Sequence, residues 1–290
     1  MLFGAIEAGG TKFVVAVGKE NGEVVEKKTI PTTTPDETIR EVEKFFANKQ
    51  LTSVGVGTFG PVDLNSNRET YGFITTTPKV KWQNYNLLGE LKEILHVPVA
   101  IDTDVNVAAL GEKTLGAAKD VDSCLYLTVG TGIGGGAVMN GQTVKGLSHP
   151  EMGHVRVVKH PNDSFSGTCP FHGSCLEGMA SGPAIKERWG ESAEQLQDRN
   201  EVWEMEAYYI AQGLVSFMYT LSPEKMILGG GVMQQKQLFS LIHEEVYKLN
   251  ANYYDLPILQ KENIHSYIVP PELGSNAGIV GALLLAEQNV

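Results

Sequence analysis

The sequence predicts an α/β protein of two lobes, and three observations support this fold class. Apolar stretches of strand length alternate with amphipathic stretches of helix length along the 290 residues, as in sheets covered by helices. A strand, a turn of glycine and threonine, a second strand and an Asn-Gly pair occur in this order twice, starting near residues 2 and 124; this indicates related lobes. With 42% hydrophobic residues, the chain is long enough for each lobe to have its own core.

The first half begins with two strands joined by a glycine turn. The apolar runs 2–6 and 13–17 flank Glu7-Ala-Gly-Gly-Thr-Lys12. Because this turn joins strand to strand, it differs from a Walker-type loop, which opens a helix. Asn21-Gly22 predicts a hairpin turn to a third strand. Apolar spacing predicts the other elements of this half, which are helices at 35–48, 87–95 and 105–115 and strands at 53–57 and 97–101.

The second half repeats the opening pattern. An apolar strand at 124–129 leads to a glycine turn at 130–136, a return strand at 137–139 and then Asn140-Gly141. The same reading predicts helices at 182–188, 201–220, 238–249 and 276–288, and strands at 226–232 and 265–269. We therefore expect an N-terminal lobe at 1–118 and a C-terminal lobe at 119–275, with the terminal helix, about 276–290, packing back on the first lobe.

Composition narrows the class of protein. A net charge of -11 and a pI near 5.1 argue against a nucleic-acid surface, because phosphate binding needs clustered Lys and Arg. The first residues lack the basic segment of a signal peptide, and no apolar run is long enough to span a bilayer. Three cysteines, two of them in a metal-like spacing, fit a reducing compartment. We expect a cytoplasmic protein with neither nucleic-acid nor membrane partners.

Residues 149–178 form the segment with the strongest chemical signal. Cys169, His172 and Cys175 are spaced three residues apart, so one tight turn brings three metal donors together. Zinc in a structural site takes four such donors, and His154 is far enough upstream to supply the fourth. His149 and His160 are alternative fourth donors, and a loop with incidental thiols is the simpler alternative to a zinc site. The prediction is a zinc-binding loop at 149–178.

Three glycine runs predict a nucleotide site. The turns at 9–12 and 130–136 would present backbone N–H groups to phosphates, and Thr11, Lys12 and Thr131 add two hydroxyls and a cation. A third run, Gly229–Gly231, lies at the end of the strand predicted at 226–232. Each turn alone is explained by tight β-turn geometry, but three of them favour nucleotide bound between the lobes. Glu7 is the one acid of the first turn, and it is suited to hold Mg²⁺ through water.

Asp104 is the candidate general base. It lies at a strand-to-helix junction, where an acid is also explained as a helix cap or first-turn residue. In phosphoryl transfer, a carboxylate at this position would accept the proton of the attacking hydroxyl. Three further side chains, Asn106, Glu151 and Glu177, are suited to bind sugar hydroxyls. Trp82 is suited to cover a sugar face, although an aromatic residue at such a place more often packs in the interior.

These residues lie in motifs that resemble those of the ROK-family sugar kinases, and most of all its bacterial fructokinases. The matching motifs, in chain order, are Glu7-Ala-Gly-Gly-Thr-Lys12, Gly60-Pro-Val-Asp63, Asp102-Thr-Asp-Val-Asn106, Gly130-Thr-Gly-Ile-Gly-Gly135, His149-Pro-Glu-Met-Gly-His154, Cys169–Glu177 and Gly229-Gly-Gly-Val232. The resemblance covers nearly the whole chain. It implies the actin-like ATPase (ribonuclease H-like) fold of two lobes, a central cleft for nucleotide and sugar, the cofactors ATP, Mg²⁺ and Zn²⁺, and a homodimer.

The resemblance also implies roles for individual residues. Asp104 matches the general base, and the adenosine turn is matched by Gly229, Gly230 and Gly231. The phosphate-binding positions are matched by Gly9, Gly10, Thr11, Lys12, Thr131 and Gly132. Sugar-contacting positions are matched by Gly60, Thr103, Asp104, Glu151, His154 and Glu177. The zinc ligands are matched by His154, Cys169, His172 and Cys175, which makes His154 the expected fourth ligand.

Three positions depart from the common family pattern and refine the expected substrate. Many members have Asp where this chain has Glu7, Asn where it has Thr103, and Cys where it has His172. The last two changes resemble the fructokinase branch. The resemblance therefore implies ATP-dependent phosphorylation of D-fructose to fructose 6-phosphate, with kinases of glucose, mannose or N-acylhexosamines as alternatives. A sugar-responsive regulator is disfavoured, because the first strand starts at residue 2 and leaves no room for a helix-turn-helix.

Zinc is expected to position residues rather than react. Held by the loop at 149–178, the acids Glu151 and Glu177 would face the sugar at fixed distances, with His154 touching both metal and substrate. Removal of zinc should then weaken sugar binding more than nucleotide binding.

Overall fold

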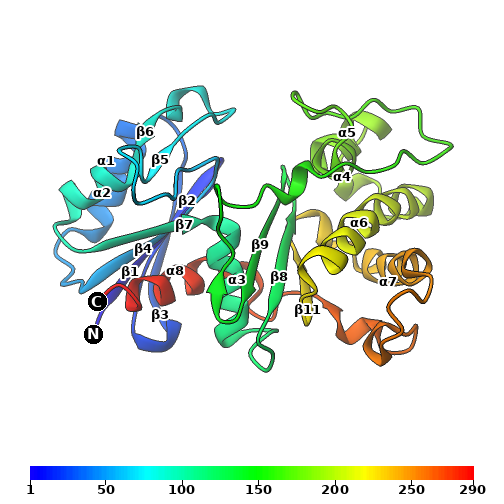
Figure 1. Cartoon of the computed structure of the whole chain (residues 1–290). Coiled ribbons are helices and arrows are strands. Elements are labelled where there is room, and N and C mark those ends of the chain that lie inside the picture. The colour runs from blue at the N-terminus through cyan, green and yellow to red at the C-terminus, as the bar shows by residue number, and fades with distance from the viewer. The chain divides into compact units, whose positions relative to one another are not determined.

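All residues from 1 to 290 are described in the computed structural model, and the chain divides into two units (Figure 1). The first unit contains Met1–Lys119, Gly136–Pro150 and Glu272–Val290, and the second contains Asp120–Gly135 and Glu151–Pro271. Residues 136–150, which the sequence places in the second lobe, therefore belong to the first unit. That these units are the lobes of a kinase stays a proposal.

The first unit is built on a five-stranded sheet of order β3-β2-β1-β4-β7. Its strands are β1 (Phe3–Ala8), β2 (Lys12–Gly18), β3 (Val24–Pro31), β4 (Ser53–Thr58) and β7 (Val99–Thr103). The hairpin strands β1, β2 and β3 pair antiparallel, whereas β4 and β7 run parallel to β1. A small two-stranded sheet, β5 (Phe73–Ile74) with β6 (Tyr85–Asn86), lies between β4 and β7 along the chain.

Helices cover both faces of this sheet. One face packs against α1 (Pro35–Phe46) and α2 (Leu87–Leu95), through a core that includes Ile6, Phe13 and Val42. The other face packs against α8 (Ala277–Glu287), whose Ile279 and Leu283 meet Phe3. Helix α3 (Asp104–Leu115) lies beside α8 and β4. In Figure 1 the red α8 accordingly runs next to the blue strands of the opening hairpin.

The starts of these helices are fixed by side-chain caps. Thr34 accepts a hydrogen bond from the backbone N–H of Glu37 at the start of α1, where Pro35 also favours helix initiation. Asn86 caps α2 in the same way. Thr103 caps α3 by accepting from the Asn106 N–H at 3.1 Å. Such a cap contributes about 1 kcal/mol, and it fixes where each helix leaves the end of its strand.

Glu112 of α3 anchors two of the four places where the chain passes between units. Its buried carboxylate accepts hydrogen bonds from the backbone N–H of Ala117 at 2.7 Å, Glu272 at 3.1 Å and Leu273 at 2.9 Å. Residue 117 lies just before the crossing at Lys119, and residues 272–273 lie just after the return. One carboxylate thus fixes the first-unit ends of these two crossing segments.

The second unit contains the parallel strands β8 (Cys124–Val129), β11 (Lys225–Gly229) and β12 (Ile268–Val269). They belong to a sheet of order β10-β9-β8-β11-β12, in which β9 (Ile133–Met139) pairs at its far end with β10 (Gln142–Thr143). The helices are α4 (Leu176–Ala180), α5 (Gly182–Trp189), α6 (Asn200–Leu221) and α7 (Lys236–Asn250). α6 packs against α7 and α4, and its Trp203 and Tyr209 are fully buried.

Most predicted elements are present, and three differ. The glycine turn predicted at 130–136 ends at 132, because Gly134, Gly135 and Gly136 belong to β9. The strand predicted at 265–269 is reduced to Ile268–Val269, preceded by a 3-10 turn at Ile264–Ser266. The five-residue α4 is too short for a periodic signal and was not predicted. None of the helices is both long and apolar enough to cross a membrane.

Candidate active site and metal centre

In the first unit, the predicted site residues gather at one edge of the sheet. β1, β4 and β7 are parallel, and their last residues, Ala8, Thr58 and Thr103, are neighbours in register. The carboxyl ends of parallel strands are where α/β sheets bind ligands. The glycine turn follows β1, Gly60 follows β4, and Asp104 follows β7.

The turn at 9–12 is a short hairpin closed by its own backbone. The Gly9 N–H donates to the Lys12 carbonyl at 3.0 Å, and the Thr32 hydroxyl of the neighbouring segment donates to the Gly9 carbonyl at 2.7 Å. Thr11 and Lys12 are exposed. Lys79, which sequence reasoning missed, lies over the turn, with its Cε 3.2 Å from where a Cβ on Gly10 would stand. The turn therefore carries two cations.

Glu7 is a half-buried acid close to the first glycine turn. Burial raises the pKa of its carboxyl group, while the charges of Lys12 and Lys27 lower it. The neighbouring Gly278 of α8 leaves no room for a side chain, because a Cβ there would come within 2.7 Å of the Glu7 carboxyl carbon. A single carboxylate with nearby lysines cannot supply all the ligands of a metal ion. It suits Mg²⁺, which keeps most of its waters and takes one or two carboxylates.

Asp104 is the first residue of α3 and is half-buried, with its Oδ1 accepting from the Val105 N–H at 2.9 Å. Behind it, the buried Asp102 accepts from Asn106 Nδ2 at 2.7 Å and pairs with Lys145 at 2.8 Å. Thr143 adds a hydrogen bond of 3.1 Å to Asp102. Asp102 therefore braces the strand end that carries Asp104.

Three side chains considered for sugar contact are buried instead. Thr103 uses its hydroxyl to cap α3, and any contact with substrate stays a prediction. Asn106 is fully buried, with its amide nitrogen on Asp102 and its Oδ1 without a partner. Trp82 is 1% exposed, donates to the Thr33 carbonyl and packs against neighbouring aromatic rings, so the packing interpretation holds for Trp82.

His149 and His160, the two alternative zinc ligands, are occupied elsewhere. His149 is buried, and its Nε2 accepts from the Val62 N–H at 3.2 Å, beside Gly60. In the second unit, His160 Nδ1 accepts from the Asn162 N–H at 3.2 Å. Neither belongs to the group of close metal donors.

The second unit repeats the arrangement of the first at its own sheet edge. The turn at 130–132 follows β8, and Gly229–Gly231 follows the parallel neighbour β11. Gly230 has φ +96°, and a side chain there would overlap the backbone of Val129, so only glycine fits. The two runs are adjacent, since a Cβ on Gly130 would lie 3.8 Å from the Gly231 nitrogen.

Glu177 and Glu151, the two acids around the metal motif, have different surroundings. Glu177, in the first turn of α4, accepts with Oε2 from the Ile133 N–H at 2.9 Å, directly after the glycine turn. Glu151 is exposed and precedes the 3-10 turn that leads to His154. The link between Glu177 and the glycine turn joins residues 44 positions apart, and no sequence signal indicates it.

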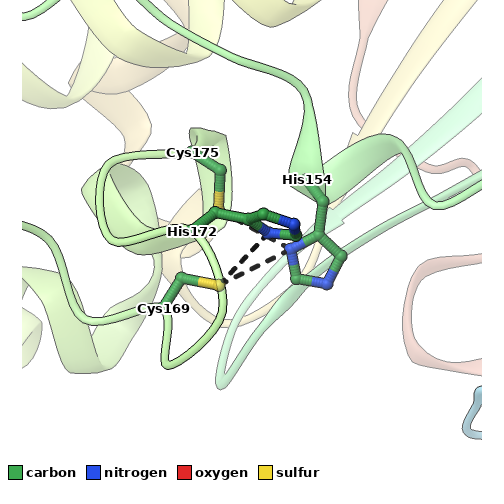
Figure 2. Close-up of side chains that lie close together, drawn as sticks. All are labelled: His154, Cys169, His172 and Cys175. Carbon is green, nitrogen blue, oxygen red and sulfur yellow. Dashed lines mark hydrogen bonds between the residues drawn. The ribbon is translucent and has the colours of Figure 1, made fainter.

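His154, Cys169, His172 and Cys175 form a metal-binding group whose donor atoms all lie within 4.8 Å of one another. In Figure 2 the two imidazoles and two thiols converge on one point. Sγ of Cys169 is 3.8 Å from Nδ1 of His154 and 3.6 Å from Nδ1 of His172, and Sγ of Cys175 is 3.6 Å from Nδ1 of His154. Tetrahedral zinc with ordinary bond lengths puts sulfur and nitrogen about 3.6 Å apart.

The chemistry of the donors also fits zinc. Burial raises the pKa of the Cys175 thiol to about 11, so a bound cation is needed to hold it as a thiolate at neutral pH. Two sulfurs and two nitrogens with no open position are the donor set of a structural zinc site. The structure thus brings together the four residues that the sequence predicted, with His154 as the fourth.

Comparison with known proteins places the chain in a family. The sequence model of the ROK family matches residues 3–289. The chain belongs to the ROK family. Among ROK relatives, it is 54% identical over 287 residues to a putative fructokinase of Bacillus subtilis (strain 168), covering 99% of this chain and 96% of that one. It is 45% identical to a fructokinase of Pediococcus pentosaceus, covering 99% of this chain and 98% of that one.

Solved structures of the ROK family agree in fold. The ROK hexokinase of Thermus thermophilus superimposes with a TM-score of 0.81 at 26% identity, covering 99% of this chain and 98% of that one. The family resemblance and the α/β, actin-like fold class predicted from the sequence are therefore confirmed.

Proposed function

We propose that this ROK-family protein is an ATP-dependent fructokinase, which transfers the γ-phosphoryl group of ATP to the 6-hydroxyl of D-fructose. The observation that carries the proposal is the identity of 54% and 45%, over nearly the full chain, to relatives named as a putative fructokinase and a fructokinase. The geometry supports it, because the predicted phosphate and base residues follow the carboxyl ends of parallel strands in each unit.

Asp104 is proposed to accept the proton of the attacking hydroxyl. Its carboxylate is fixed at the start of α3, with one oxygen on the Val105 N–H. Phosphoryl transfer has a loose transition state, so a positioned carboxylate of ordinary basicity is sufficient. Asp102, held by Asn106 and Lys145, keeps the strand end in place.

The two glycine turns are proposed to bind the phosphates of ATP. Their backbone N–H groups, the hydroxyls of Thr11 and Thr131 and the ammonium groups of Lys12 and Lys79 would stabilise the charge that develops during transfer. Glu7 would hold magnesium through water, and the ion would supply positive charge that offsets the charge of the phosphates. Gly229–Gly231 is proposed to line the adenosine. Zinc on His154, Cys169, His172 and Cys175 would have a structural role.

We propose that Gly60, Glu151, His154 and Glu177 contact the sugar, together with Asp104. The fructose preference rests on the relatives and on Thr103 and His172, which match the fructokinase pattern. Glucose, mannose and N-acylhexosamines are the alternative substrates.

An ATP-coupled assay over a panel of hexoses tests the proposal. We expect ADP release only when a hexose is present, with the highest kcat/KM for fructose and fructose 6-phosphate as the product. ADP release without sugar would overturn the kinase assignment, and a higher kcat/KM for glucose or mannose would overturn the fructose assignment.

We also propose that the protein is a homodimer in the reducing cytoplasm. Support comes from the family resemblance and from three free cysteines, two of which belong to the metal group. Light scattering of the zinc-loaded protein at micromolar concentration should give twice the chain mass of 31.5 kDa.

A further inference from the structure

The second glycine turn depends on residues that are distant in sequence. Its Gly130 carbonyl accepts from the Gly182 N–H at 2.7 Å, and Ile133, the residue after the turn, donates its N–H to Glu177 Oε2 at 2.9 Å. Ile133 is buried and its hydrogen bond to Glu177 is part-buried, so water replaces a lost acceptor only in part. An unpaired buried N–H is unfavourable, and without Glu177 the turn would shift to satisfy it.

Glu177 is itself held by the short helix α4, which is fixed at both ends. The residue before α4 is Cys175, a member of the metal group, and its carbonyl accepts from the Met179 N–H at 3.0 Å. At the other end, Nη2 of Arg188 donates to the Met179 carbonyl at 2.8 Å. A five-residue helix is not stable alone, so these two attachments determine where Glu177 lies.

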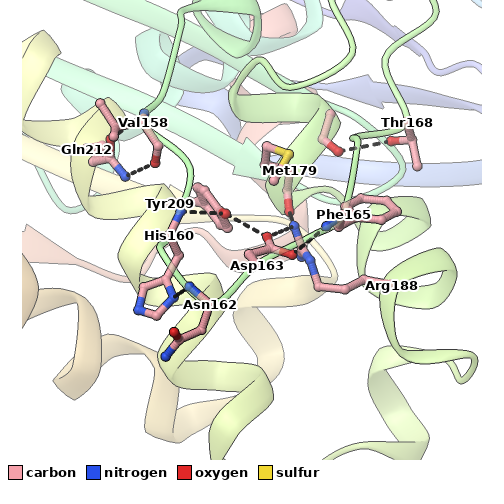
Figure 3. A network of polar contacts seen from close by, with 11 residues as sticks. Val158, His160, Asn162, Asp163, Phe165, Thr168, Met179, Arg188, Tyr209 and Gln212 are labelled. Atoms are coloured by element: carbon pink, nitrogen blue, oxygen red, sulfur yellow. Dashed lines mark hydrogen bonds and ion pairs between the residues drawn. The ribbon is translucent and has the colours of Figure 1, made fainter.

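The attachment at Arg188 leads back to the metal loop. Figure 3 shows the Arg188 side chain between the Met179 carbonyl and the carboxylate of Asp163, which lies in the segment between His154 and Cys169. Arg188 Nη2 and Asp163 Oδ2 are 3.2 Å apart, and both side chains are nearly inaccessible to solvent. Tyr209 of α6 donates to the same oxygen at 2.6 Å.

This ion pair determines where α4 lies relative to the metal loop. Two nitrogens of Arg188, Nε and Nη1, are buried without a hydrogen-bond partner. A buried ion pair with unpaired groups is often no more stable than an apolar packing of the same volume. Its definite effect is geometric, because the planar guanidinium joins α4 and the metal loop at set distances.

We propose that Glu177 is a positioning residue that couples the metal centre to the second phosphate turn. Zinc on Cys175 and the Asp163–Arg188 pair hold α4, α4 holds Glu177, and Glu177 holds Ile133 so that Gly130–Gly132 present their N–H groups correctly. This inference rests on the proposed role of that turn in ATP binding. It changes the expectation from the sequence, because loss of zinc should weaken nucleotide binding as well as sugar binding.

Variants of Glu177 test the proposal in the zinc-loaded protein. Glu177→Ala leaves the Ile133 N–H without an acceptor, whereas Glu177→Gln keeps a carbonyl oxygen for it. With zinc content held at about one per chain, we expect the Ala variant to bind a non-hydrolysable ATP analogue at least about fivefold more weakly. The Gln variant should restore most of this affinity. Glu151→Ala is the matched control, because it removes the second acid beside the metal motif, outside α4, and it should change only sugar binding.

Hydrogen exchange supplies a readout independent of activity. The amide of Ile133 should exchange faster in Glu177→Ala than in the wild type and in Glu177→Gln, with or without nucleotide. Chelation of zinc should weaken nucleotide binding in the wild type by a larger factor than in Glu177→Ala, because the link is already broken there.

The outcomes separate this inference from the proposed function. If the wild type binds the analogue and Glu177→Ala binds it equally well, with unchanged exchange at Ile133, the coupling is wrong and the kinase assignment stands. If the wild type binds no nucleotide, the proposed function fails, and exchange at Ile133 still reports whether Glu177 positions the turn.

Discussion

The two glycine turns have similar sequences and are held in different ways. The turn at 9–12 is closed by a hydrogen bond within its own hairpin and by the Thr32 hydroxyl of the adjoining strand end. The turn at 130–132 has one internal hydrogen bond, from the Gly130 N–H to the Gly132 carbonyl at 2.9 Å. Its other supports, Gly182 and Glu177, come from residues about 50 positions further along the chain.

The difference shows that two turns of similar sequence can respond differently to loss of a metal ion or of a buried ion pair. The first turn depends on β-hairpin hydrogen bonds, which form wherever β1 and β2 pair. The second depends on a carboxylate whose position follows from a short helix, a metal group and a buried ion pair. Loss of the metal ion, or of the buried Asp163–Arg188 pair, should therefore affect the second turn and leave the first turn unchanged.

The largest expected effect comes from replacing the proposed general base, which belongs to neither turn. Asp104→Asn should lower kcat by about 10² or more, because the hydroxyl proton loses its acceptor, while both turns and their nucleotide affinity are retained. Steady-state kinetics with fructose and ATP measures this loss. Asp36→Asn, which changes a first-turn acid of α1, is the control and should leave kcat near the wild-type value. Retention of wild-type turnover by Asp104→Asn would exclude it as the base.

A matched pair of alanine substitutions compares the turns directly. A Cβ on Gly9 would come within 2.7 Å of the Lys12 carbonyl oxygen, which is backbone, whereas a Cβ on Gly132 would come within 2.7 Å of Glu177 Oε2, which is the far end of a side chain and needs only a small shift. Gly9→Ala should therefore lower the free energy of unfolding by about 1–3 kcal/mol, and Gly132→Ala by clearly less. Denaturant unfolding gives both values. Equal losses would show that the second turn is as rigid as the first.

The buried acid Glu206 of α6 gives the second unit a pH-dependent stability. Burial raises the pKa of this fully inaccessible carboxyl group well above its ordinary value of 4.5, and the charge of Arg188 lowers it only in part. The folded state therefore keeps a proton that the unfolded state releases above pH 4.5, and this contribution to stability declines as pH rises towards the folded pKa. Glu206→Gln removes the dependence.

The free energy of unfolding of Glu206→Gln should accordingly exceed that of the wild type by an amount that grows with pH. The growth should be at most about 1.4 kcal/mol per pH unit. Thermal melts between pH 5 and 8 in one buffer series measure it, with Glu204→Gln on the same helix as the control. A gain that shrinks with rising pH would mean that Glu206 is ionised and paired in the folded protein.

The smallest expected effect concerns the local support of the first turn. Thr32→Val removes the hydroxyl that donates to the Gly9 carbonyl and keeps the side-chain shape. The loss should be about 1 kcal/mol of stability, with a modest increase in the KM for ATP and none in zinc content or in hydrogen exchange at Ile133. A change in zinc content would contradict the separation between the two turns.

Local patterns explain which parts of the site could be predicted from the sequence. The spacing of Cys169, His172 and Cys175 requires only one tight turn, and Asp104 needs only the end of a strand and the start of a helix. Glycine runs at strand ends are equally local. For these residues the sequence neighbours supply most of the geometry, so the pattern is readable without the fold.

The links that hold these parts together could not be predicted, because they join distant segments. Glu177 meets Ile133, Arg188 meets Asp163, and Lys79 reaches Gly10 from a segment that reads as irregular. The sequence predicts a turn at the glycines of β9, because glycine in a strand leaves no apolar alternation to recognise. Trp82 is a different case, because it packs in the interior against Phe13 and does not lie at the surface, where it could cover a sugar face.

The position of α8 has a consequence for synthesis on the ribosome. This helix, at Ala277–Glu287, covers one face of a sheet whose first strand is Phe3–Ala8. Glu112 accepts hydrogen bonds from the backbone N–H groups of residues 272 and 273, which come late in the chain. The first unit therefore has a high contact order, and its sheet stays uncovered on that face until Ala277–Glu287 has been synthesised. The second unit, drawn from 120–135 and 151–271, has all its residues earlier, so the part of the chain that begins first should finish folding last.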